Sequence, residues 1–174
     1  MQPSIQVRNA NLTKADYEAV FKEYLGVTNV IWVGDGIEGD DTHGHIDDLC
    51  RFVNEDTIVT IVEEDKTDAN YQPLQDNLKR LQNAKLENGQ APKIVCLPMP
   101  KRLDFEDLRL PARYANFLIL NHCVLVPTFN DSKDRIALNI LADCFPDREI
   151  IGISATDFIW GFGTLHCLSQ QIPA

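Results

Sequence analysis

The chain has 174 residues, enough for one domain with a hydrophobic core, and its 44% hydrophobic and 24% charged content is typical of a soluble globular protein. The formal net charge of -10 at pH 7 argues against binding to a nucleic-acid backbone and suits a cationic small substrate. The chain has no apolar run of roughly 20 residues and no visible signal peptide, so we expect no membrane association. Its five cysteines form no C-x-x-C pair, so we expect free thiols in a reducing cytoplasm.

The N-terminal part of the chain predicts a capped helix followed by a strand. Thr13 is a typical N-cap residue with Asp16 three positions later, and Gly26 ends the helical spacing of apolar residues. Residues 29–33 predict a short buried strand. Residues 34–48 then predict a polar loop.

Two runs with the same order of elements follow this loop. Each run is a predicted hairpin, a helix and a returning strand, and aligning Asn54 with Asn121 gives a period of about 67 residues. The elements are strands 49–52 and 57–62, helix 71–84 and strand 93–97, then strands 116–120 and 123–127, helix 134–144 and strand 149–153. We therefore predict an α/β fold built of ββαβ-type modules.

Both ends of the chain look like parts of further modules. Residues 158–171 predict a hairpin that opens another module, and the first helix and strand look like the end of an earlier one. Modules of this kind bury apolar faces against their neighbours, so incomplete modules leave apolar edges uncovered. We therefore expect the chain to be part of something larger.

Polar residues recur where each predicted hairpin begins. His45 and Asp47 lie just before the first hairpin, and Asn116 lies at the corresponding entrance to the second. Cys167 lies at the start of what is predicted as a last strand. Equivalent ends of successive modules converge on a common axis, so we expect these four residues to form one site.

The other candidate residues are assigned ordinary roles. Four cysteines are interpreted as small hydrophobic residues: Cys50, Cys96, Cys123 and Cys144. Three carboxylates are interpreted as residues that solvate a loop: Asp40, Asp41 and Asp48.

Residue types alone leave two alternative functions open. The first is a metal site formed by Asp40, His43, His45 and Asp47. Histidines at positions i and i+2 point to opposite faces of an extended chain, so shared ligation needs a bent loop. The second is a cysteine protease that uses Cys167 and His45, although no signal for an oxyanion hole or a peptide groove is present.

Five motifs resemble those of the agmatine deiminases and the related bacterial peptidylarginine deiminases. They are Gly39-Asp40-Asp41-Thr42-x-Gly44-His45-Ile46-Asp47 with Arg51-Phe52, Leu110-Pro111-Ala112-x-Tyr114-Ala115-Asn116-Phe117, Val126-Pro127-Thr128-Phe129, Phe145-Pro146-Asp147-Arg148-Glu149, and Gly163-x-Leu165-His166-Cys167-Leu168-Ser169-Gln170-Gln171-Ile172-Pro173. They run in order over essentially the whole chain. The resemblance implies a closed ring of five ββαβ-type modules around a substrate channel, of which residues 1–174 form about half, the C-terminal half of the catalytic domain.

The resemblance also implies roles for the four site residues. Cys167 is expected to attack the guanidinium carbon, and His45 to protonate the leaving ammonia and then activate water. Asp47 is expected to bind the guanidinium through bidentate hydrogen bonds, and Asn116 to position the substrate. The implied reaction converts agmatine to N-carbamoylputrescine and ammonia, with peptidyl-arginine as the alternative substrate. No cofactor and no metal is expected.

The chain departs from the family pattern in three respects. His43 stands where the family has aspartate, and Phe162 stands where it has glycine. The Trp-x-Arg-Asp and Glu-Gly-Gly motifs of the family's N-terminal half do not occur. A non-catalytic fragment that needs a partner half, or that self-associates, is therefore an alternative.

Carboxylates near Cys167 should raise the pKa of its thiol, and a bound guanidinium should reverse that effect.

Overall fold

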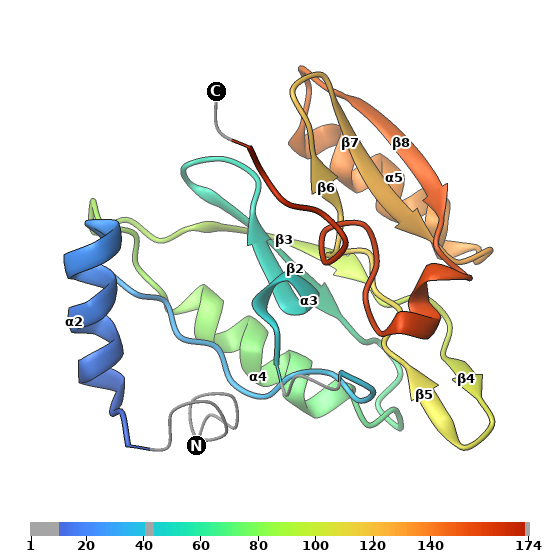
Figure 1. The fold of residues 1–174 in the computed structure, drawn as a ribbon, viewed down its shortest axis with the longest axis horizontal. Coiled ribbons are helices and arrows are strands. Elements are labelled where there is room, and N and C mark those ends of the chain that lie inside the picture. The colour runs from blue at the N-terminus through green and yellow to red at the C-terminus, as the bar shows by residue number, and fades with distance from the viewer. Residues whose placement is uncertain (1–10, 41–43, 173–174) are drawn as a thin grey trace.

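The computed structural model describes residues 11–40 and 44–172 and contains two three-stranded sheets (Figure 1). The first module consists of β1 (Cys50–Phe52), β2 (Thr57–Val62), α4 (Tyr71–Gln82) and β3 (Lys93–Pro98). The second consists of β6 (Leu118–Ile119), β7 (Cys123–Thr128), α5 (Lys133–Cys144) and β8 (Glu149–Ser154). In each module the first two strands are antiparallel and the last two are parallel. The predicted order of hairpin, helix and returning strand therefore occurs twice.

The central strand of the first module, β2, is buried along almost its whole length. Its residues are all Thr, Ile or Val, types that favour a pleated and packed surface. Ile58 and Ile61 are 2% and 0% exposed. At the preceding turn, the side-chain oxygen of Asn54 accepts hydrogen bonds from the backbone N–H groups of Asp56 and Thr57, at 3.1 and 2.9 Å. The predicted hairpin is therefore confirmed.

Helix α4 covers this sheet and also anchors the polar loop. Leu74 and Leu81 are each 1% exposed, whereas Leu78, predicted on the same stripe, is half-buried. Asn77 lies on the buried side of α4. Its Oδ1 accepts a hydrogen bond from the backbone N–H of Gly34 at 2.6 Å, and its Nδ2 donates to a carbonyl of the same loop at 2.8 Å. The start of the loop is thus held against the first module.

A short hairpin that was not predicted connects the two modules. It consists of β4 (Leu103–Phe105) and β5 (Leu108–Leu110). Glu106 in its turn has φ 52°, a conformation that Gly or Asn usually marks, so the usual sequence signal is missing. Arg109 is 4% exposed and donates to Glu38 at 3.0 Å, which fastens the hairpin to the polar loop.

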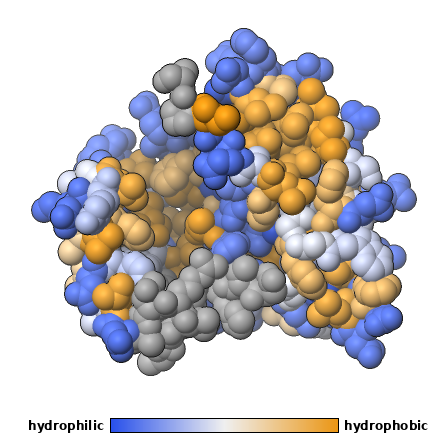
Figure 2. Space-filling view, viewed as in Figure 1, coloured by the Kyte–Doolittle hydropathy of each residue, from blue (hydrophilic) through white to orange (hydrophobic). Residues whose placement is uncertain are grey.

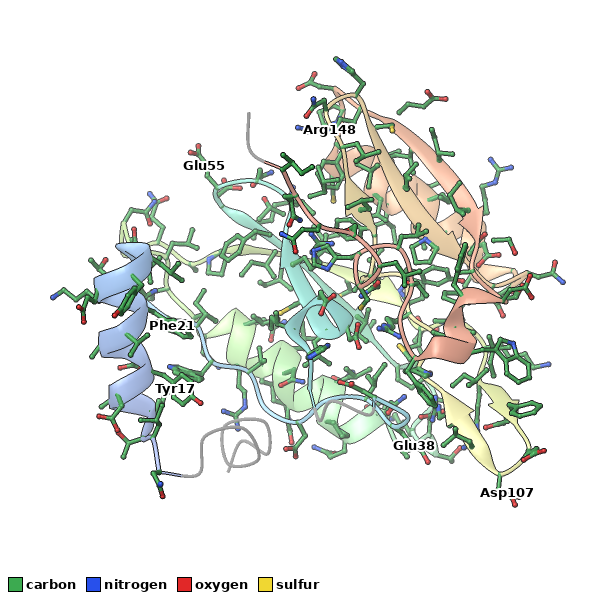
Figure 3. The ribbon with its side chains drawn as sticks, viewed as in Figure 1. Tyr17, Phe21, Glu38, Glu55, Asp107 and Arg148 are labelled. Atoms are coloured by element: carbon green, nitrogen blue, oxygen red, sulfur yellow. The ribbon has the colours of Figure 1, made fainter. Side chains whose placement is uncertain are left out.

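The N-terminal helix forms as predicted, but the strand after it does not. Helix α2 (Lys14–Leu25) begins at a capping box of Thr13 and ends at Gly26 with φ 71°. None of its twelve residues, all of which the structure describes, is buried. Figure 3 shows Tyr17 and Phe21 on the side of α2 that faces the body of the protein. The predicted strand at 29–33 is wrong because no strand among the described residues pairs with it.

The predicted hairpin at 158–171 is also wrong. This segment forms a short 3₁₀ helix, η1 (Phe158–Gly161), followed by turns, so Cys167 lies in a turn and not at the start of a strand. The reason is a long-range contact, because the backbone N–H groups of His166 and Cys167 are bound by the side chain of Asn116. Those groups are therefore unavailable to a strand partner.

The two modules leave apolar side chains on the surface. Figure 2 shows hydrophobic residues gathered over the second module on the face in view. Elsewhere, Leu25 and Leu168 are 69% and 67% exposed, and the exposed Trp160 packs against Phe105 with ring centroids 4.0 Å apart. Across the part of the chain that the structure describes, no helix has the length and apolar content to cross a bilayer.

Replacing Leu81 by Ala should lower the free energy of unfolding by about 2–5 kcal/mol, because the substitution leaves a cavity under α4. The matched control is Leu25→Ala at an exposed position of α2, which should change it by less than about 0.5 kcal/mol. Urea unfolding followed by circular dichroism measures both values. Equal losses for the two variants would contradict the packing of α4.

Candidate active site

Three segments that are distant in the sequence meet at one place. Helix α3 (Ile46–Leu49) supplies Asp47, the loop before β6 supplies Asn116, and the C-terminal turn supplies Cys167. Asn116 Nδ2 lies 2.9 Å from Asp47 Oδ2 and 3.0 Å from Cys167 Sγ. The sulfur lies 3.4 Å from the same carboxylate oxygen. Three of the four predicted site residues are thus in mutual contact.

Asn116 is the residue that joins these segments. It is 0% exposed, and its Oδ1 accepts hydrogen bonds from Thr164 Oγ1 at 2.8 Å and from the backbone N–H groups of His166 and Cys167 at 3.1 and 3.2 Å. The two hydrogens of Nδ2 face three acceptors, which are Asp47 Oδ2, Cys167 Sγ and, at 3.0 Å, Asp48 Oδ1. A single buried amide therefore positions the turn that carries the thiol and the helix that carries the carboxylates.

The sequence was interpreted to place Asp48 in a solvated loop, and the structure shows that this interpretation is wrong. Asp48 is 1% exposed and forms a buried ion pair with Arg113, which is 0% exposed. The Arg113 Nε donates to Asp48 Oδ1 at 2.7 Å, and its Nη2 makes a second, closer contact with the same oxygen. The separation of 65 positions in the sequence explains why this pair was not recognised. Asp40 is also structural, because its Oδ2 accepts from the backbone N–H groups of Gly44 and His45.

The two histidines near the site occupy different positions. His45 is the N-cap residue of α3, two residues before Asp47, and its imidazole belongs to none of the described hydrogen bonds that join Asp47, Asn116 and Cys167. Its role in proton transfer stays a prediction. His166 was not assigned a role, yet its Nδ1 lies 2.7 Å from Asp47 Oδ2. Its place directly before Cys167 was the available signal.

Burial and neighbouring charges set the protonation of the site. Burial raises the pKa of the Cys167 thiol, and the charges of Asp47 and Asp48 raise it further, against the hydrogen bond from Asn116. Burial alone would also raise the pKa of Asp47, but hydrogen bonds from His166 and Cys167 outweigh it, and this pKa is lowered. Burial raises the pKa of Asp48 to about 7 despite its pairing with a guanidinium. The free site thus holds an ionised Asp47 beside a protonated thiol at neutral pH.

Ligand-type atoms of Asp47, Asp48 and Cys167 lie within 4.8 Å of one another, the spacing of a small metal site. Their other contacts fit a hydrogen-bonded cluster better. Asp48 already pairs with Arg113, whose Nη2 also lies 3.8 Å from Cys167 Sγ, so this carboxylate is occupied by a cationic partner of its own. The alternative metal set of Asp40, His43, His45 and Asp47 stays a prediction, because His43 lies outside the described residues.

Gly163 lies so close to Cys167 that a larger residue at position 163 should displace the thiol. A Cβ at Gly163 would lie 2.8 Å from Cys167 Cβ, whereas one at Gly161 would meet no atom within 4 Å. We expect Gly163→Ala to slow iodoacetamide alkylation of Cys167 or change its pH dependence, and the matched control Gly161→Ala to leave both unchanged. Peptide mass spectrometry measures this, and identical behaviour of the two variants would contradict the geometry of the turn.

The raised pKa of Cys167 predicts a specific pH profile. The thiolate is the reactive form, so the alkylation rate of the free chain should still be rising at about pH 9. A millimolar concentration of guanidinium ion should move the profile to lower pH, because a bound cation offsets the two carboxylates. Mass spectrometry must follow the Cys167 peptide, since Cys96 is also exposed. A rate already maximal at pH 7 without ligand would contradict this prediction.

Comparisons with known proteins agree with the motifs. The family model described as Porphyromonas-type peptidyl-arginine deiminase matches residues 4–173. An agmatine deiminase of Pseudomonas fluorescens is 32% identical over 185 residues, which cover 96% of this chain and 50% of that protein. The chain spans about half the length of the curated relatives it matches.

Solved structures show the same relationship in three dimensions. A Porphyromonas gingivalis protein provisionally named an arginine deiminase matches with a TM-score of 0.94 and 41% identity, over 99% of this chain and 51% of that one. A cysteine-to-serine variant of C. jejuni agmatine deiminase, with substrate bound, matches with a TM-score of 0.84 and 38% identity, over 91% of this chain and 46% of that one. The chain therefore belongs to the Porphyromonas-type peptidyl-arginine deiminase family.

Proposed function

We propose that this chain carries the nucleophile and much of the catalytic machinery of a deiminase that hydrolyses a guanidino substrate, agmatine first among them. The observation that carries the proposal is the convergence of Cys167, Asp47 and Asn116 within 3.4 Å, from three separate segments, in a member of this family. The products are N-carbamoylputrescine and ammonia. A relative solved with substrate bound is an agmatine deiminase, which supports the choice of substrate.

The thiol of Cys167 acts as the nucleophile. Its sulfur adds to the guanidinium carbon, and a C–N bond then breaks as ammonia leaves, which forms a covalent thiouronium. Water adds to the same carbon, the C–S bond breaks, and the ureido product leaves with the thiol restored. His45 protonates the departing nitrogen and later takes a proton from water, so one imidazole serves both half-reactions. The exposure of Cys167 gives a substrate access to the sulfur.

Asp47 binds the substrate cation. Its Oδ2 already accepts from Asn116 and faces His166 Nδ1 and the thiol, so the carboxylate is oriented before substrate arrives. A guanidinium can donate two parallel hydrogen bonds to a carboxylate, each worth about 1.5–3 kcal/mol. The pKa of Asp47 is lowered, so its carboxylate is ionised at neutral pH. Asn116 holds the Asp47 carboxylate in this orientation through the hydrogen bond from its Nδ2.

Peptidyl-arginine is the second candidate substrate. The family model that matches the chain describes a peptidyl-arginine deiminase, and arginine in a peptide presents the same guanidinium as agmatine. The chemistry at Cys167 is the same for both. The difference lies in what surrounds the other end of the substrate, and comparison of agmatine with an arginine peptide in one assay separates the two.

A partner half is the second feature of the proposal. The relatives are about twice as long, and the segment that contains α2 and residues 29–33 lacks a sheet to pack on: α2 has no buried residue among those described, and 29–33 pairs with no described strand. We propose that residues 1–174 form the C-terminal half of a catalytic domain whose ring of five modules is closed by another polypeptide segment or by self-association. Such closure would cover α2 and supply further substrate ligands.

The test is ammonia and ureido-product formation from agmatine by the purified chain. Cys167→Ala should reduce turnover by about a thousandfold or more, since it removes the nucleophile. Turnover that survives in Cys167→Ala would contradict the proposed mechanism. A folded chain without turnover supports the fragment alternative, and size-exclusion chromatography then shows whether it self-associates. A well-folded inactive monomer would leave a separate partner half as the explanation.

A further inference from the structure

Arg113 is a buried cation directly beside the candidate nucleophile. It is 0% exposed, and every nitrogen of its guanidinium has a partner. Nε and Nη2 contact Asp48 Oδ1, and Nη1 donates to the backbone carbonyls of Pro111 and Phe162. Nη2 also lies 3.8 Å from Cys167 Sγ. The guanidinium thus joins α3, the loop before β6 and the turn that carries the thiol.

The sulfur of Cys167 lies between hydrogen-bond donors and an acceptor. Asp47 Oδ2, at 3.4 Å, can accept the S–H proton and so favours the neutral thiol. Asn116 Nδ2 at 3.0 Å and Arg113 Nη2 at 3.8 Å can only donate, and so favour the thiolate. Which form prevails therefore depends on how many of these partners are present and charged.

Five charged or titratable groups surround the sulfur, from α3, β1, the loop before β6 and the C-terminal turn: Asp47, Asp48, Arg51, Arg113 and His166. The two carboxylates oppose formation of a thiolate. Arg113 is the cation with a direct contact to the sulfur, and its rigid fork is held by buried partners. Because burial weakens screening by water, its charge acts on the sulfur, in part offset by its counter-ion Asp48.

We propose that Arg113, with Asp48 as its counter-ion, is a positioning residue that stabilises the thiolate of Cys167 and holds the turn that carries it. The inference rests on the proposed function only in taking Cys167 as the nucleophile. When a substrate guanidinium occupies Asp47, the S–H group loses its acceptor, and its proton passes to water. Asn116 and Arg113 then stabilise the sulfur anion until it attacks.

Phe162 connects this charge to the shape of the turn. Its φ of 61° lies in the left-handed region, which disfavours a bulky residue. Its backbone carbonyl accepts the hydrogen bond from Arg113 Nη1 at 3.1 Å, and Gly163 follows it against the thiol. The buried cation therefore acts on the sulfur directly and also holds the backbone that positions it.

A double-mutant cycle on the ionisation of Cys167 tests this role. The apparent pKa is taken from the pH dependence of iodoacetamide alkylation of the Cys167 peptide, in the full chain without substrate. Arg113→Met should raise it by about one unit or more and slow alkylation at pH 8 about tenfold. Asp48→Asn should lower it, because Asp48 is ionised over the pH range in which the thiol titrates.

The double variant and a conservative variant separate charge from packing. Arg113→Met combined with Asp48→Asn should return the apparent pKa to within about half a unit of the unmodified chain, since both charges are removed together. Arg113→Lys retains the charge and should keep the pKa close to its original value. If Arg113→Met does not fold, the double variant compared with Asp48→Asn supplies the same sign, because adding Arg113→Met must raise the pKa.

Two results would overturn the proposal. One is an apparent pKa of Cys167 in Arg113→Met that is unchanged or lower than in the unmodified chain. The same holds if the pKa in the double variant is unchanged or lower than in Asp48→Asn. The other is a shift of equal size and direction in Arg113→Met, Arg113→Lys and Asp48→Asn, which would show that Arg113 only supports packing. Because no turnover is measured, failure of the chain to convert agmatine bears on the proposed function and leaves this test intact.

Discussion

The buried side chain of Asn116 is the interaction on which the site depends. Its oxygen is bound by the C-terminal turn and its nitrogen by α3, so one amide joins segments that are 68 and 51 positions away. Both polar atoms lie out of contact with water, where an unmade hydrogen bond costs about 1–3 kcal/mol. The turn has no strand pairing, and the amide replaces the hydrogen bonds that a strand would have provided.

The same cluster resolves a conflict between binding a cation and using a thiolate. Carboxylates that attract a guanidinium also oppose ionisation of the neighbouring thiol, and they add to burial, the largest cause of the raised pKa of Cys167. We infer that the buried Arg113 limits this effect, because its guanidinium contacts the sulfur and has Asp48 as its own carboxylate partner. We expect a cation that arrives at Asp47 to favour the reactive thiolate.

The modules position these groups without supplying them. Each has a central strand paired in parallel with a returning strand, and the candidate residues Asp47 and Asn116 lie in the segments that lead into the hairpins, whereas Cys167 lies in the C-terminal turn. Backbone in such segments is free of the regular ladder, so side chains can bind it, as Asn116 does. Helix α2 has no sheet to pack on among the described residues, and apolar side chains such as Leu25 remain exposed.

Local pattern was sufficient to predict the two modules, because the continuous apolar and β-branched run of β2 and the helical spacing of leucines in α4 are properties of neighbouring residues. Module order also predicted that Asp47, Asn116 and Cys167 meet. The strand at 29–33 was predicted wrongly, since a strand exists only with a partner. The pairing of Asp48 with Arg113 and the turn at Cys167 depend on contacts across 65 and 51 positions, and no local pattern encodes which buried charges or amides will face each other once the segments pack.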